Sequence, residues 1–233
     1  ELVEAGAGRG EEHDLARPGV GQRLRHRGVE AAEPAARILA AELGWDEWDG
    51  EIVPCILSEE VSGGDLTGLL SVYSLSKQSN LAGYRAAFAA GDPELVATLV
   101  NTRKHAGMIV PAPVQHAMAV ALADDAHVAE QKDRYRRRRD ALRTALEASG
   151  HTVDHSEAGL YLWTRRADLD PADATAQDSW DLLGELADLG IIAGPGVFYG
   201  AGGDGYVRVA ITATDEAVAR AAARLTARGP RTG

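Results

Sequence analysis

The sequence predicts an α/β protein built from two layered domains, and three observations lead to this expectation. Short β-prone runs alternate with helical segments from about residue 42 onward, as in layered folds rather than helical bundles. Hydrophobic residues make up 45% of the 233 residues, which is enough for a folded core. A long amphipathic segment, Ala126–Ala148, separates two groups of elements. We therefore expect an atypical, disordered segment at 1–41, a first domain at 42–125 and a smaller α+β domain at 126–233.

The first domain is expected to contain two strands and two helices. Leu69–Tyr73 is a short apolar, β-prone run and predicts a buried strand. A second strand is predicted at Tyr84–Ala90, after a turn. The helices are predicted at Pro93–His105 and Pro113–Leu122, because proline fits the first turn of a helix.

The second domain begins with the helix Ala126–Ala148, which Gly150 is expected to end. Ser179 is expected to cap a later helix, and Thr214 or Asp215 the last one, because short polar side chains accept hydrogen bonds from a first helical turn. The predicted elements are strands at His151–His155, Gly159–Thr164, Ile191–Ala193 and Tyr206–Ile211, and helices at Ser179–Leu189 and from about residue 214 to Gly229.

Composition excludes several classes of function. The formal net charge of -11 disfavours nucleic-acid binding, and we interpret the basic run Arg134–Arg139 as a solvated helix face rather than a partner site. No apolar run approaches the ~18 residues that a membrane helix needs. His151 and His155 fall in one predicted strand, which would place them ~13 Å apart, too far for one metal. Cys55 is the single cysteine, so we expect no internal disulfide and a reducing, cytoplasmic compartment.

Lys77 has the most suggestive surroundings of any lysine in the chain. Lysine is rare in this arginine-rich sequence, and it can lose its proton and form a Schiff base, which arginine cannot. Lys77 follows a predicted strand, where α/β proteins place their sites. Its polar neighbours are Ser74, Ser76, Ser79 and Asn80, followed by Arg85, and serine hydroxyls with a guanidinium are suited to an anion. The pattern fits a phosphorylated aldehyde cofactor; the alternative is a polar loop after a strand.

The amino-acid sequence around Lys77 indicates a family. Ser74–Arg85 reads SLSKQSNLAGYR and resembles the cofactor-lysine signature of class I and II aminotransferases, which have the aspartate aminotransferase fold. The resemblance extends from about Glu42 to Leu225. It implies the type I fold of pyridoxal-phosphate-dependent transferases, with 42–125 as the C-terminal part of the large domain and 126–233 as the small domain.

The same resemblance assigns expected roles to single residues. Lys77 would bind pyridoxal 5'-phosphate covalently and move a proton during the reaction. Ser74 and Arg85 would bind the cofactor phosphate, with Ser76 assisting. Arg208, in a late strand after a Pro-Gly turn, would bind the α-carboxylate of the substrate, since a planar guanidinium suits a carboxylate.

Three segments resemble one branch of the family, the actinobacterial succinyldiaminopimelate aminotransferases. They are Ser79–Arg85, Arg103–Gln115 and Ser156–Trp163. This branch transfers an amino group from glutamate to N-succinyl-2-amino-6-oxopimelate, on the route to diaminopimelate and lysine. The partners implied are a small amino donor, an oxo-acid acceptor and a second copy of the chain in a homodimer. A diacid substrate also needs a second cation, for which Arg103 and Lys104 are candidates.

The sequence departs from the family pattern before the lysine. Counting back from the segment that begins at Leu43 places Arg37 where the family has the aspartate that pairs with the cofactor ring, and Ala40 where it has a tyrosine. The chain starts at Glu1 and is shorter than whole family members, so we expect a fragment. The alternatives are a truncated inactive remnant, or another enzyme of this fold and cofactor with a different amino acceptor.

Overall fold

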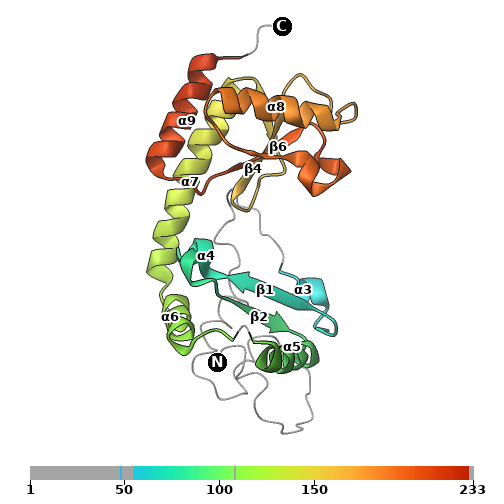
Figure 1. Ribbon diagram of the computed structural model, residues 1–233, viewed down its shortest axis with the longest axis vertical. Coiled ribbons are helices and arrows are strands. Elements are labelled where there is room, and N and C mark those ends of the chain that lie inside the picture. The colour runs from blue at the N-terminus through green and yellow to red at the C-terminus, as the bar shows by residue number, and fades with distance from the viewer. Residues whose placement is uncertain (1–47, 49–54, 108, 231–233) are drawn as a thin grey trace. The chain divides into compact units, whose positions relative to one another are not determined.

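The computed structural model of the chain describes Trp48 and residues 55–107 and 109–230 (Figure 1). These residues group into two compact units. The first unit contains the described residues from Cys55 to Gln131, and the second contains Trp48 and the described residues from Lys132 onward. The predicted segment at 1–41, including Arg37 and Ala40, lies outside the described residues.

A two-stranded antiparallel sheet lies at the centre of the first unit. Its strands are β1 (Leu70–Ser74) and β2 (Ala87–Gly91), paired along their whole length. The chain passes from one strand to the other through two short turns, α4 (Leu75–Gln78) and η2 (Ala82–Tyr84). Among the described residues, the buried apolar core of this unit consists of Leu57, Leu66, Leu75, Ala86, Phe88, Ala90, Met118 and Leu122.

The described part of the first unit contains three further helices, α3 (Glu59–Ser62), α5 (Pro93–Ala106) and α6 (Ala112–Leu122). Asp92 caps α5, since its carboxylate accepts hydrogen bonds from the N–H groups of Gly68 at 2.7 Å and Glu94 at 2.8 Å. These bonds, that of Gly68 first, lower the pKa of Asp92. The ionised carboxylate therefore joins the start of α5 to the turn before β1.

The second unit contains a four-stranded antiparallel sheet in the order β3-β4-β6-β5. The two central strands bury Leu162 and Val207 completely, and α8 (Ala176–Asp188), which lies across the sheet in Figure 1, buries Leu182 and Leu186. Burial of this kind stabilises such a unit by about 2 kcal/mol for each large apolar side chain. The strands are β3 (His151–Asp154), β4 (Tyr161–Arg166), β5 (Gly194–Pro195) and β6 (Tyr206–Ala210).

Two long helices complete the second unit. Helix α7 (Asp125–Ala148) begins in the first unit and continues into the second, where α9 (Asp215–Arg228) lies beside it (Figure 1). Arg138 of α7 donates a hydrogen bond to Asp215, and this contact is the main reason that the pKa of Asp215 is lowered. Thr214, one of the two caps that the sequence predicts, caps α9 by accepting from the N–H of Ala217.

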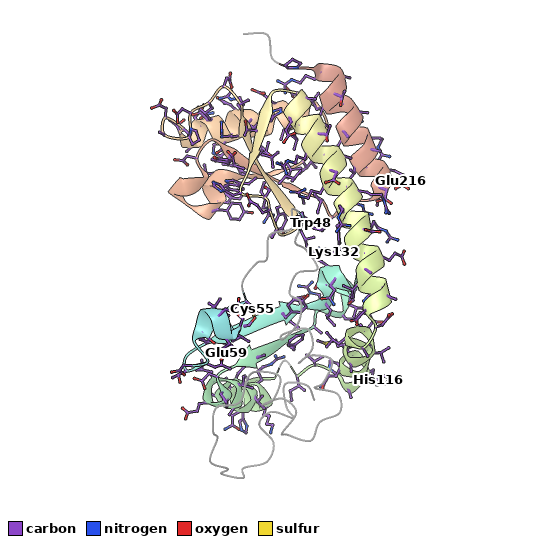
Figure 2. The ribbon with its side chains drawn as sticks, turned by 180° about the vertical axis from the view of Figure 1, so that it is seen from behind. Trp48, Cys55, Glu59, His116, Lys132 and Glu216 are labelled. Carbon is purple, nitrogen blue, oxygen red and sulfur yellow. The ribbon has the colours of Figure 1, made fainter. Side chains whose placement is uncertain are left out.

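Trp48, labelled in Figure 2, is a described residue that precedes the segments 55–107 and 109–230. Its indole N–H donates to the carbonyl of Gly159 at 2.7 Å, and its backbone N–H donates to the carbonyl of Glu157 at 3.0 Å. Both carbonyls lie in the connection between β3 and β4. Trp48 is therefore attached to the hairpin of the second unit.

Two strand predictions in the first unit need correction. β1 is present, but the expectation that it is buried is wrong, because none of its residues is fully buried and Val72 is 68% exposed. The second strand begins at Ala87 and not at Tyr84. Tyr84 belongs to the turn η2, and Arg85 then adopts a left-handed conformation with φ of 52°, which cannot continue a strand.

Two predictions in the second unit are also wrong. Ile191–Ala193 is no strand. The N–H of Ile191 donates to the carbonyl of Leu186 and closes the end of α8, after Gly190 at φ of 70°, and the side chain of Ile191 is buried at this point. Ser179 does not cap α8, which starts one turn earlier at the N-cap Thr175. The Ser179 hydroxyl is buried and donates to the carbonyl of Gly203 at 3.1 Å.

Candidate functional site

The candidate lysine lies in α4, the single helical turn that directly follows β1. Ser74 ends the strand and caps this turn: its hydroxyl accepts from the N–H of Ser76 at 3.2 Å, and the two hydroxyl oxygens are 2.6 Å apart. Leu75 and Gln78 are buried, and they fix the turn against the rest of the unit. We refer to residues 74–81 as the lysine turn.

Lys77 is half-buried and lies between the two buried anchors of the lysine turn. Among the described residues it makes no ion pair or side-chain hydrogen bond, so no carboxylate there neutralises its amine. A lysine held by its own helical turn, with an amine not engaged in an ion pair, has the chemistry that a carbonyl-binding lysine requires.

Arg85 follows the lysine turn with an exposed side chain and a left-handed backbone. Its Nη1 donates to the carbonyl of Ala82 at 3.2 Å, and no carboxylate among the described residues pairs with it. A left-handed conformation costs a residue with a β-carbon on the order of 1 kcal/mol, and such positions cluster at functional sites. The guanidinium is therefore free to bind an anion with its remaining donors.

The structure thus brings Ser74 and Ser76 together and places Lys77 and Arg85 in the same short segment between β1 and β2. The donor set consists of two hydroxyls, one amine and one guanidinium. This set fits a phosphorylated aldehyde, in which the phosphate needs hydrogen-bond donors and positive charge and the carbonyl needs an amine. Among the described residues, no group of histidine, cysteine and carboxylate side chains could hold a metal ion.

Arg208 lies in the second unit, on β6, where it is paired with Trp163 of β4 and Gly194 of β5. Its guanidinium carbon lies 4.2 Å from the ring centre of Tyr161 and 5.2 Å from that of Tyr199. Cation–π contacts of this kind orient the guanidinium through its face.

The Arg208 guanidinium has no acceptor in the part of the chain that the structure describes. Its Nε is buried without a hydrogen-bond partner, and it forms no ion pair there. A buried donor of a charged group without an acceptor is costly, at about 1–3 kcal/mol. Arg208 as a whole is only half-buried, so the guanidinium donors other than Nε are the ones that could bind a carboxylate.

A tight turn positions one of the two tyrosines. Tyr199 ends η3 (Gly196–Tyr199), which follows β5. Gly196 and Gly203, the last residue of η4 (Ala201–Gly203), lie in close contact, because a β-carbon on Gly196 would be 2.0 Å from the carbonyl oxygen of Gly203. Only glycine at both positions permits this approach, which holds the segment that carries Tyr199.

The other cations considered from the sequence have different environments. Arg103 is half-buried and Lys104 is exposed in the last turn of α5. Nothing in their geometry tests the role of second substrate cation, which stays a prediction. In the basic run Arg134–Arg139, the interpretation as a solvated face is wrong for Arg139, which is buried and donates to the carbonyl of Ser156 at 3.0 Å.

Sequence reasoning did not find the aromatic residues around Arg208, nor a polar chain at the lysine turn. Tyr161 lies in the resembling segment Ser156–Trp163, but neither it nor Tyr199 was given a role. The signal for Tyr161 would have been its place two residues before Trp163 on a paired strand. The polar chain joins Ser79 to His127, whose spacing of three residues from Asp124 at a helix start was the available signal.

Comparison with known proteins agrees with these features. The profile described as aminotransferase class I and II matches residues 44–225. The chain is 54% identical over 185 residues to 4-dedimethylamino-4-oxo-anhydrotetracycline transaminase from Streptomyces rimosus, covering 79% of this chain and 48% of that protein. It is 56% identical over 179 residues to a probable aminotransferase from Mycobacterium tuberculosis, covering 77% of this chain and 40% of that protein.

Solved structures show the same relationship. The probable N-succinyldiaminopimelate aminotransferase from Thermus thermophilus superposes with a TM-score of 0.63 at 26% identity, covering 79% of this chain and 47% of that one. The expected α/β fold class, part of the type I fold of pyridoxal-phosphate-dependent transferases, is confirmed. The chain spans about half the length of the relatives that it matches. It belongs to the class I and II aminotransferases, a family that depends on pyridoxal phosphate.

Proposed function

We propose that this chain carries the cofactor lysine and the substrate arginine of an aminotransferase. Lys77 binds pyridoxal 5'-phosphate, Ser74, Ser76 and Arg85 bind its phosphate, and Arg208 binds the carboxylate of the substrate. The observation that carries the proposal is the composition of the lysine turn: an amine without an ion pair among the described residues, beside two adjoining hydroxyls.

The chain's own residues divide the chemical work. The cofactor, when bound, supplies an electron-withdrawing ring that stabilises negative charge beside the transferred amino group. The Lys77 amine accepts and returns the proton that moves during transfer. The phosphate donors fix the ring relative to that amine, and Arg208 orients the substrate through two parallel hydrogen bonds to its carboxylate.

For the substrate, we propose glutamate as donor and N-succinyl-2-amino-6-oxopimelate as acceptor, in a cytoplasmic homodimer. The three segments that resemble succinyldiaminopimelate aminotransferases support this acceptor. The structural relative from Thermus thermophilus carries the same kind of name.

A second candidate acceptor is an oxo compound such as 4-dedimethylamino-4-oxo-anhydrotetracycline. The Streptomyces rimosus relative, at 54% identity, is named for such a substrate. The tyrosines beside Arg208 and the exposed ring of Phe198, which contacts Trp180 edge to face at 5.8 Å between ring centres, offer aromatic surface. Incubation with glutamate and each acceptor separately, followed by mass detection of the aminated product, distinguishes the two.

The first experiment asks whether the chain binds the cofactor. The purified chain and its Lys77→Ala variant are mixed with pyridoxal phosphate, freed of excess and examined by visible absorbance. A band that is present in the natural chain, absent in the variant and bleached by glutamate supports the proposal. Absence of a band in both proteins would refute cofactor binding by this chain and favour an inactive remnant of the family.

A further inference from the structure

A three-residue polar chain fastens the lysine turn to the start of α7. The Nε2 atom of His127 lies 2.8 Å from the hydroxyl oxygen of Ser79, two residues after Lys77. Its Nδ1 lies 3.1 Å from the carboxylate of Asp124. All these residues belong to the first unit, so the contact is made within one compact body.

The direction of each hydrogen bond follows from the charge of Asp124. The N–H of Ala126 donates to its carboxylate at 2.9 Å, and this bond, followed by that of His127, lowers the pKa of Asp124. An ionised carboxylate only accepts, so Nδ1 of His127 carries the proton. In the neutral imidazole, Nε2 is then the acceptor and the hydroxyl of Ser79 donates to it.

The lysine turn needs such an anchor. A helix of one turn has no cooperative stability of its own, because nucleation is unfavourable. The turn must also accommodate Asn80 in a left-handed conformation, with φ of 54°. The buried side chains of Leu75 and Gln78 hold the turn on either side of Lys77. Next to the left-handed Asn80, the hydroxyl of Ser79 makes the contact with His127 of α7.

The order carboxylate, imidazole and hydroxyl is also that of a serine nucleophile with its base, but the backbone argues against that use. The N–H of Ser79 donates to the carbonyl of Leu75 at 3.2 Å, and the N–H of Asn80 donates to that of Lys77. Both groups are therefore engaged and cannot stabilise an oxyanion. The arrangement is suited to holding a backbone segment in place.

We propose that His127 is a positioning residue for Lys77, acting through Ser79 and oriented by Asp124. This inference rests on the proposed function of Lys77 as the cofactor lysine. His127 touches no reacting group; it restrains the turn so that the lysine stem leaves the chain in one direction. A positioned amine reacts faster than one that samples several orientations.

The test compares His127→Ala, Ser79→Ala, the double variant and the conservative His127→Gln, whose amide oxygen can also accept from Ser79. His116→Ala is the matched control, because His116 is exposed on α6 of the same unit (Figure 2). The first readout is hydrogen exchange at the amides of the lysine turn. We expect about fivefold faster exchange in each single alanine variant, because this factor corresponds to the loss of the free energy that one ordinary hydrogen bond contributes.

Site-specific labelling provides the second readout. Pyridoxal phosphate is trapped on the natural chain with borohydride, and peptide mass spectrometry compares Lys77 with Lys104 and Lys132, which serve as internal references. We expect trapping at Lys77 to slow about fivefold in His127→Ala and Ser79→Ala and no further in the double variant. His127→Gln should restore it to within about twofold, and labelling of the reference lysines should not change.

The outcomes separate the two proposals. Unchanged exchange and unchanged Lys77 trapping in His127→Ala would overturn the positioning role, as would faster exchange spread evenly over the unit or full additivity in the double variant. If the natural chain shows no preference for Lys77 while exchange in the lysine turn responds as expected, the cofactor proposal fails and the anchor stands.

Discussion

Gly196→Ala is expected to destabilise the second unit strongly. A β-carbon at this position would lie 2.0 Å from the carbonyl oxygen of Gly203 and 2.7 Å from that of Tyr206. Both obstacles are backbone atoms, and the approach to Gly203 is a full ångström closer than β-carbons normally come, so the turn itself would have to move. We expect the free energy of unfolding to fall by about 3 kcal/mol, which is at the upper end of the usual cost of overpacking.

The matched control is Gly184→Ala in α8 of the same unit. A β-carbon there meets nothing within 4 Å, and Gly184 lies inside a helix. The control should therefore gain about 0.5–1 kcal/mol, because alanine loses less backbone freedom on folding. The same methyl group is thus added at two positions, and the expected changes in the free energy of unfolding have opposite signs.

Thermal unfolding followed by circular dichroism measures both variants. For a unit of this size, 3 kcal/mol corresponds to a melting temperature lower by roughly 12–24 °C, whereas the control should melt several degrees higher. The reasoning would be refuted if Gly196→Ala melted within about 2 °C of the natural chain. Such a result would mean that the turn from Gly194 to Gly203 relaxes freely and does not fix Tyr199 over Arg208.

Two further substitutions test the second unit. Arg208→Lys keeps the charge but loses the planar fork held between Tyr161 and Tyr199, so kcat/KM for the amino donor should fall about a hundredfold; an unchanged value would exclude carboxylate binding by Arg208. The pKa of Asp178 is lowered, mainly by the hydroxyl of Thr175, so its carboxylate contributes stability above an unfolded pKa of about 3.9 that is lost as pH falls through the lower folded value. At pH 6, the melting temperature of Asp178→Asn should therefore be lower than that of the natural chain. Between about pH 4 and pH 2, it should fall less steeply with pH than that of the natural chain. Parallel plots of melting temperature against pH for the two proteins would contradict this.

The elements that the sequence predicted well are those with local signals at their ends. Pro93 opens α5, Gly150 follows α7 and Thr214 caps α9, and each of these residues acts on its immediate neighbours. The short apolar run at Ile191 was misread because burial alone does not distinguish a strand from the closing contact of a helix. The decisive bond joins Ile191 to Leu186, five residues earlier, and leaves no periodic signature.

The candidate sites were predictable to different extents. The residues of the lysine turn form one continuous segment, so their proximity follows from the sequence. The setting of Arg208 does not, because it depends on strand register: Trp163 lies opposite Arg208, which brings Tyr161 diagonally next to it. The position of Arg139 could not be predicted either. A basic run on a helix does not indicate which of its guanidinium groups is buried and donates to a backbone carbonyl, as Arg139 does to Ser156.

The two candidate sites can be measured independently, and this decides how a loss of activity should be interpreted. The lysine turn and its His127 anchor are assembled by contacts within the first unit, and Arg208 with its tyrosines by contacts within the second. Labelling of Lys77 therefore reports on the first site, and the melting behaviour of Gly196→Ala reports on the second. A chain that passes both tests but transfers no amino group would have two intact local sites, and the cause of the loss would then lie outside these two sites.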